Sequence, residues 1–494
     1  MRASGILLPV SSLPSPYGIG CFSKEAYEFI DQLAEAGQKY WQILPLGPTG
    51  YGDSPYQSFS TYAGNPYFID LRQLIEAGIL KKAECDRADF GGNAECIDYE
   101  KLYLTRYQLM RTAYERSNVK DDEDFHRFQQ EEAYWLKDYA LFMAVKRHFQ
   151  DVCWTEWPED IRLRYGYALD YYRTELYYEI EFQEYVQYLF AGQWRKLKAY
   201  ANAAGVQIIG DIPIYVSYDS SDVWSHPELF QLDENRMPTA VAGCPPDGFS
   251  ATGQLWGNPL YAWECHEQTG YQWWISRICY CTRLYDVVRI DHFRGFDQYF
   301  SIPFGDETAE HGHWEQGPGM KLFDRLKECA GEVNIIAEDL GFLTDSVKKL
   351  VEDSGFPGMK VLEFAFDSRE ESDYLPHTYP RNCVVYTGTH DNETIAGWYQ
   401  KLPKEDLQLV WDYMDNQFAA PEKIHWDFIR LAMLSVADTC IIPLQDYLGL
   451  GHEARINTPS TLGDNWKWRM KKGMFTKKLM GQIRKLTAVS GRGR

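Results

Sequence analysis

Three short apolar segments in the second half of the chain each run directly into an acidic residue. The segments and their acids are 287–290 with Asp291, 334–337 with Glu338, and 383–390 with Asp391. The stretches between them are long enough to hold a helix, which predicts parallel strands joined by helical crossovers. In a parallel barrel the carboxyl ends of the strands gather on one face, where active sites form. The spacing therefore predicts three carboxylates around a single site.

Arg289 stands two residues before Asp291 in the first of these segments. Side chains alternate between the faces of a strand, so Arg289 and Asp291 are expected to point the same way. A buried carboxylate beside a fixed guanidinium stays ionised at neutral pH, as a nucleophile requires. A structural ion pair at a strand end is the alternative. The two further acids favour function, because three carboxylates suit glycosidic-bond chemistry.

Five more apolar segments complete a series of eight predicted strands. They lie at 5–10, 40–46, 206–211, 359–366 and 438–446. Eight strands in strict order with right-handed crossovers predict the α/β class and a complete (β/α)8 TIM barrel. Asp211 ends the third strand and is predicted to hold its neighbours by hydrogen bonds, below the catalytic acids. Glu363 is a fourth acid, predicted to lie mid-strand as the partner of a barrel lysine or arginine.

Two long segments interrupt this alternation within one catalytic domain, which we take to span 1–494. Residues 71–165 are charged and helical in pattern, and we interpret them as an inserted helical subdomain. Residues 217–274 are rich in Pro, Gly, Asp and Trp, with little periodicity. Loops of this length are usually functional, so we interpret this segment as a loop-rich subdomain over the active site. The chain ends soon after the eighth strand, and no C-terminal β-sandwich is expected.

Composition excludes several classes of partner. The formal net charge of −21 argues against nucleic acid and anionic membranes, which bind basic patches. The eleven cysteines form no CxxC pair, and no signal peptide or membrane-length apolar stretch is evident, so a cytoplasmic location is expected. No metal is predicted, because neither His-Glu pair has the second histidine of a zinc site. Residues 449–454 match a dinucleotide fingerprint, but no helical pattern follows, so no cofactor is predicted. The oligomeric state is not set by the sequence.

Motifs along nearly the whole chain closely resemble the 4-α-glucanotransferase family, which includes amylomaltases and disproportionating enzymes and is related to the α-amylases. The resembling motifs are Gly5-Ile6-Leu7-Leu8-Pro9, Asp211-Ile212-Pro213-Ile214-Tyr215-Val216, Gly253-Gln254-Leu255-Trp256-Gly257-Asn258-Pro259-Leu260-Tyr261 and Asn457-Thr458-Pro459. The resemblance implies transfer of an α-1,4-glucan segment to the 4-hydroxyl of an acceptor by retaining double displacement. On this resemblance Asp291 is the nucleophile, Glu338 the acid/base and Asp391 the transition-state stabiliser. Retaining chemistry requires the first two carboxyl groups to lie about 5–5.5 Å apart.

The implied partners are malto-oligosaccharides and α-1,4-glucans derived from starch or glycogen, with glucose as an acceptor. An α-1,4-glucan hydrolase on the same scaffold and a catalytically silent glucan-binding protein are the two alternatives. Maltotriose products would separate transfer from hydrolysis, and binding without turnover would indicate the silent protein.

Substrate contacts are expected from the long loops and strand ends. In the Gly- and Pro-rich loop at 47–57, Tyr56 is predicted to stack on a glucose unit and Gln57 to bond a hydroxyl, the alternative being a self-packed surface loop. The resemblance adds Asp247, Phe249, Gln254 and Trp256 as glucan contacts. The proposed reaction adds Arg289 beside Asp291, His390 as a partner of sugar hydroxyls, and Asn457, in the loop after strand eight, as a further candidate contact. The family often has a large residue where Gly248 stands, so this loop is expected to be more mobile here.

Overall fold

The structure is a computed structural model that describes residues 2–493 except 51, 247–249, 342, 370 and 416–420. The expected contacts Asp247 and Phe249, and the mobility expected around Gly248, therefore lie outside the described residues.

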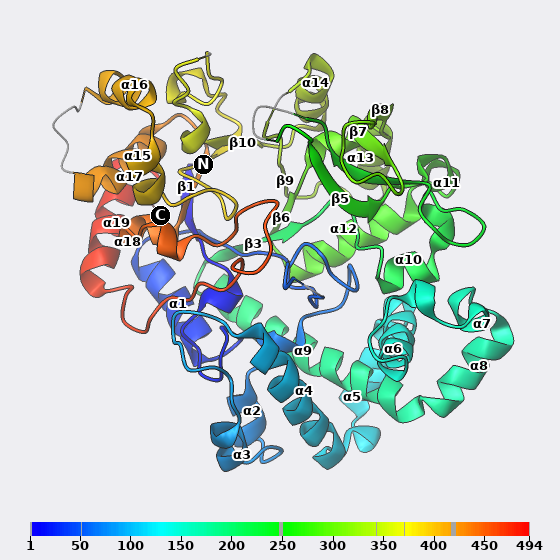
Figure 1. Cartoon of the computed structure of the whole chain (residues 1–494). Coiled ribbons are helices and arrows are strands. Elements are labelled where there is room, and N and C mark those ends of the chain that lie inside the picture. Colours follow the sequence, from blue (N-terminus) through cyan, green and yellow to red (C-terminus); the bar gives the residue numbers. More distant parts are fainter. Residues whose placement is uncertain are drawn as a thin grey trace.

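Eight parallel strands form the central sheet, in the order β10-β11-β12-β1-β2-β3-β6-β9 (Figure 1). Their bounds are β1 Ala3–Leu7, β2 Tyr40–Gln42, β3 Gln207–Ile212, β6 Val287–Ile290, β9 Ile335–Ala337, β10 Gly358–Val361, β11 Cys383–Tyr386 and β12 Thr439–Pro443. The gap between β9 and β10 is bridged where Ala337 N donates to Pro357 O at 3.0 Å. Met359 N also donates to Asp339 Oδ1 at 2.6 Å. The sheet is therefore nearly closed, and the predicted (β/α)8 barrel is confirmed.

Apolar side chains fill the barrel and the layer between its strands and outer helices. The interior cluster consists of Leu7, Ile209, Ile336, Met359, Val361, Val384, Tyr386 and Ile441. The outer helices include α1 Lys24–Glu35, α9 Tyr177–Ala203, α12 Gln272–Leu284, α13 Met320–Ala330, α14 Asp345–Ser354, α15 Ile395–Lys401, α16 Lys404–Met414, α17 Ile424–Leu434, α18 Leu444–Leu448 and α19 Lys477–Val489. In α1, Phe29, Ile30 and Leu33 recur at helical spacing and are buried against the strands. Between β10 and β11 the described residues form only 3-10 turns.

A group of helices separates β2 from β3 and packs beside the long helix α9 (Figure 1). These helices are α2 Leu71–Glu76, α3 Lys82–Arg87, α4 Tyr99–Arg116, α5 Glu123–Glu131, α6 Ala133–His148, α7 Glu159–Arg162 and α8 Gly166–Glu175. In α4, Tyr99 is buried and donates to Trp466 O at 2.8 Å. Tyr107 bonds Gln183 on α9 at 3.1 Å. These two tyrosines therefore join the helices to the rest of the molecule.

A second sheet, which the sequence pattern did not reveal, stands beside the barrel. It is antiparallel, in the order β5 Gln254–Pro259, β4 Ala240–Cys244, β7 Gln298–Pro303 and β8 His313–Gln316. Val241, Phe300 and Ile302 contribute to its small apolar core. Gly243 and Gly257 interrupt the strand alternation, which explains why 217–274 resembled loop. The sheet places Gln254 and Trp256 on a strand.

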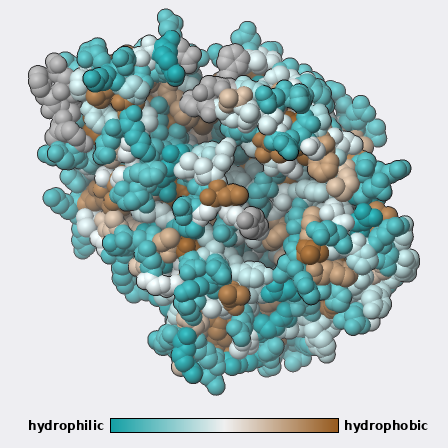
Figure 2. All heavy atoms as spheres, viewed as in Figure 1, coloured by the Kyte–Doolittle hydropathy of each residue, from teal (hydrophilic) through white to brown (hydrophobic). Residues whose placement is uncertain are grey.

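The face seen in Figure 1 is mostly hydrophilic, with scattered apolar residues and a hollow near its middle (Figure 2). None of the helices in the described ranges is both long and apolar enough to cross a membrane.

Candidate active site

Asp291 and Glu338 leave neighbouring strands at the same level. Ile290 of β6 pairs with Ala337 of β9, so each acid is the first residue after a paired position. Glu338 N donates to Ile290 O at 3.1 Å, which continues the ladder by one step. The two acids therefore emerge side by side at the carboxyl ends of the strands, where barrel active sites form.

Arg289 is shared between two carboxylates. It is only 3% exposed, and its Nη1 lies 2.6 and 2.8 Å from the two oxygens of Asp211. The same nitrogen lies 3.1 Å from Asp291 Oδ1, so the two side chains face the same way, as strand alternation predicts. Asp211 is fully buried on the adjacent strand β3, opposite Arg289 in register. It anchors the guanidinium from below, which supports the structural role predicted for it.

Burial raises the pKa values of both neighbouring acids. For Asp291 the pKa lies well above its ordinary value, with Arg289 opposing burial and Glu338 adding to it. For Glu338 burial also raises the pKa, whereas Arg289 and two backbone N–H groups lower it. These groups belong to Leu340, at 2.8 Å from Oε1, and His292, at 2.6 Å from Oε2. A proton on one acid relieves the repulsion, and the direct contact with Arg289 favours Asp291 as the ionised member.

Asp391 is held from two sides. Asn457 Nδ2 donates to its Oδ1 at 2.6 Å, and His390 Nε2 lies 3.4 Å from its Oδ2. Burial lowers the pKa of His390, so the ring is neutral at pH 7 and its Nε2–H can donate to the carboxylate. Arg455 donates to the backbone oxygens of Asp391 and Asn457, both at 2.7 Å. The Asp391 side chain stays 42% exposed, so the held carboxylate is accessible from outside the protein.

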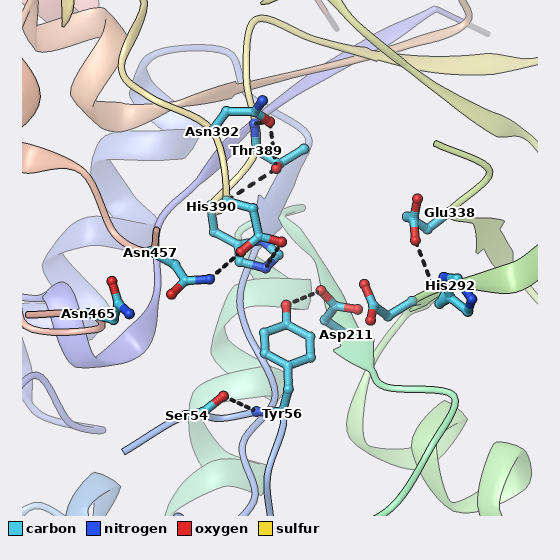
Figure 3. Close-up of polar contacts among 12 residues, drawn as sticks. Ser54, Tyr56, Asp211, His292, Glu338, Thr389, His390, Asn392, Asn457 and Asn465 are labelled. Atoms are coloured by element: carbon cyan, nitrogen blue, oxygen red, sulfur yellow. Dashed lines mark hydrogen bonds and ion pairs between the residues drawn. The ribbon is translucent and has the colours of Figure 1, made fainter. Parts of the chain in front are cut away.

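Tyr56 connects the loop after β2 with two barrel strands. Its hydroxyl donates to Asp211 Oδ2 at 2.8 Å, and its ring stacks on His390 with centroids 5.1 Å apart (Figure 3). Trp466 lies 5.8 Å from Tyr56 and 6.0 Å from His390. One face of Tyr56 is therefore occupied by protein. No local pattern in the sequence singles out Trp466, whose aromatic partners are distant in the chain.

The opposite side of the site is built from β5 and the turn after β6. Trp256 meets the His292 ring edge-on at 4.8 Å, and its Nε1 donates to Gln254 Oε1 at 3.0 Å. Burial lowers the pKa of His292 to about 3, so its ring is neutral. Gln57 donates to Asn258 Oδ1 at 3.2 Å, which ties the Tyr56 loop to β5. The predicted contacts Gln57 and Gln254 thus each bond a protein neighbour.

The prediction that Glu363 lies mid-strand and pairs with a barrel lysine or arginine was wrong. Glu363 follows β10 in a 3-10 turn, Leu362–Phe364, and forms no ion pair with another described residue. Its Oε1 is buried and has no hydrogen-bond partner in the described part of the chain. Burial raises its pKa well above the ordinary value, nearby Asp446 and Glu393 raise it further, and the charge of Arg455 opposes them. The side chain of Lys401 donates to Glu393 instead, at 2.6 Å.

Known proteins resemble this chain over its whole length. A family model described as 4-alpha-glucanotransferase matches residues 8–476. The 4-alpha-glucanotransferase of Clostridium butyricum is 50% identical over 98% of this chain and 99% of its own, and that of Thermus thermophilus is 46% identical over 99% of both. An amylomaltase from Streptococcus agalactiae, solved in complex with acarbose, is 43% identical over 100% of both chains with a TM-score of 0.97.

An amylomaltase from Corynebacterium glutamicum shares the fold at 19% identity, with a TM-score of 0.80 over 98% of this chain and 75% of its own. The family model and the two curated relatives agree with the resemblance carried by the sequence motifs. The chain therefore belongs to the 4-alpha-glucanotransferase family, whose members act on α-1,4-glucans.

Proposed function

We propose that this chain performs its glucanotransferase reaction by a retaining double displacement in which Asp291 is the nucleophile and Glu338 the acid/base. One observation carries the proposal: the two acids directly follow the paired residues at the ends of β6 and β9, and Arg289 bonds Asp291. Retaining enzymes need two carboxyl groups close enough to share one anomeric carbon, and side-by-side strand ends support that arrangement.

In the first step an oxygen of Asp291 bonds to the anomeric carbon of the donor glucan and the glycosidic C–O bond breaks. Glu338 gives its proton to the departing 4-oxygen, and that part of the glucan leaves. Arg289 keeps Asp291 ionised for the attack. Burial raises the pKa of Glu338 above its ordinary value, which is the direction that an acid catalyst needs.

In the second step the 4-hydroxyl of an acceptor glucan or glucose attacks the same carbon. Glu338, now ionised, takes the hydroxyl proton, and the bond from the sugar to Asp291 breaks. Transfer exceeds hydrolysis when the acceptor excludes water from the intermediate. The walls containing Tyr56 and Trp466 on one side and Trp256 on the other support such exclusion, because aromatic faces pack against sugar rings.

Asp391 acts on the same sugar without forming a bond to carbon. Asn457 and His390 hold its carboxylate in place, and its exposed part binds hydroxyls of the sugar in the cleavage site. Hydroxyl contacts that strengthen as the ring distorts contribute several kcal/mol to glycoside cleavage. Malto-oligosaccharides are the proposed donors, which agrees with the relative solved with acarbose. A cytoplasmic location stays a prediction from the cysteine pattern.

The Asp291→Asn variant tests the nucleophile. It should lose transfer from maltotriose by at least about three orders of magnitude, because an amide cannot form the glycosyl ester. The matched control is Asp324→Asn, the same change at an exposed position on α13, which should retain activity. Wild-type enzyme should convert maltotriose to glucose plus a ladder of longer chains. Purified Asp291→Asn protein that keeps a tenth of the wild-type rate would refute the assignment, and shortening without a ladder would indicate a hydrolase.

A further inference from the structure

A second cavity lies outside the candidate active site, between α7 and α10 (Ser221–Ser225), which are on the right-hand side of Figure 1. Its volume is about 200 Å³. The residues that matter here are Trp154, Arg162, Arg164, Trp224, Glu228 and Arg236. None of them belongs to the proposed reaction, so the cavity needs a separate explanation.

Three arginines surround this cavity in a chain of net charge −21, and most of their donors are unused. Arg162 and Arg236 form no side-chain hydrogen bond or ion pair with any residue that the structure describes, and Arg162 Nε is buried. Arg164 binds Asp138 through Nη2 at 2.7 Å, but its buried Nη1 has no partner among the same residues. Buried guanidinium N–H groups without acceptors are costly, so an acceptor from outside the chain would satisfy them.

Among the described residues Glu228 is the one acid that lines the cavity, and with Asp138, which pairs with Arg164, it sets two carboxylates against three arginines. Glu228 is exposed, and its carboxylate lies 3.6 Å from His226 Nδ1. The hydrogen bond from His226 lowers the pKa of Glu228, with only a minor contribution from Arg236. The charge around the cavity therefore stays positive at neutral pH.

Two of the arginines have backbone conformations that favour glycine or asparagine. Arg164 has φ of 61° and Arg236 has φ of 69°, both in the left-handed region. Arg236 lies in the turn at 233–237, where Asp233 Oδ1 accepts from Asn235 N and Met237 N. Such strain is consistent with a use for these side chains.

We propose that this cavity binds a phosphate group, either as inorganic phosphate or as the phosphate of a small sugar ester. Guanidinium groups match phosphate oxygens in geometry, and the charges of Arg162 and Arg236, which form no ion pair with a described residue, would balance a dianion. The Arg164 guanidinium lies over the Trp224 ring, 4.2 Å from its centroid. A cavity of about 200 Å³ has room for a phosphate group or a small phosphate ester.

Isothermal titration of the intact protein with inorganic phosphate, and separately with glucose 6-phosphate, tests this site at constant ionic strength. Saturable binding should weaken at least tenfold in Arg162→Gln and in Arg236→Gln. The matched control is Arg195→Gln, the same charge change at an exposed position of α9. Glucose alone should bind the wild type and the cavity variants equally. Binding of only one probe identifies the source of the phosphate group.

Transfer from maltotriose shows whether each variant is folded, because neither arginine belongs to the proposed reaction. Arg236→Lys keeps the positive charge but loses the paired N–H donors of the guanidinium, so it should bind phosphate with intermediate affinity. The proposal is overturned if neither probe binds saturably, if chloride at equal ionic strength gives the same signal, or if the cavity variants bind as tightly as Arg195→Gln.

Discussion

Replacing Arg289 with methionine should separate the structural and chemical roles of the ion pair beneath the site. Arg289 is 3% exposed and Asp211 fully buried, so the substitution leaves a buried carboxylate without its cation. Removing one partner of a buried pair costs about 3–5 kcal/mol. The control is Arg381→Met, because Arg381 bonds Asp438 at 3.0 Å while it is 75% exposed. An exposed pair is worth about 0–1 kcal/mol, so the two variants should differ clearly.

Adding Asp211→Asn to Arg289→Met should restore part of the stability, because the uncompensated charge disappears. It should not restore transfer. Without Arg289, burial and Glu338 raise the pKa of Asp291 further, because the main opposing charge is gone. The nucleophile must be ionised, so residual activity should require a higher pH than in the wild type.

Urea unfolding followed by tryptophan fluorescence measures the stabilities, and glucose release from maltotriose across pH measures the activity. Two results would refute the reasoning. One is an Arg289→Met protein as stable as Arg381→Met, and the other is a double variant less stable than Arg289→Met alone.

Three further substitutions test other parts of the site. Glu338→Gln should slow transfer from maltotriose by about 10²–10⁴-fold but spare bond cleavage in maltosyl fluoride, whose leaving group needs no proton; equal losses would contradict the acid role. Asn457→Ala removes the 2.6 Å bond to Asp391, so kcat/KM should fall about 10–100-fold with little change in thermal stability, and an unchanged kcat/KM would count against Asp391 as a stabiliser. Burial raises the pKa of Asp446 to about 6. The stability that Asp446 contributes is therefore complete below about pH 4 and is lost as the pH rises through about 6. Asp446→Asn should gain stability over the wild type at pH 7, by about 3 kcal/mol at most, and little at pH 4; a gain independent of pH would argue against a buried, titrating Asp446.

Local patterns in the sequence were sufficient for the barrel and for the placement of its acids. The eight strands follow the predicted order, because short apolar runs mark buried parallel strands wherever they pack. The alignment of Arg289 with Asp291 follows from the two-residue period of one strand. Each family motif is a short contiguous run of residues, so the family could also be assigned from the sequence.

Contacts between segments far apart in the chain required the tertiary structure. The aromatic contacts among Tyr56, His390 and Trp466 join three distant loops, and the bond from Asn457 to Asp391 joins two of them. The second sheet pairs β4 with β7, and neither strand has a strong alternating pattern. A sequence specifies which face of an element is apolar, whereas barrel closure decides which side chains meet at the strand ends. The acids of the site could thus be predicted singly, but their partners depend on how the barrel closes.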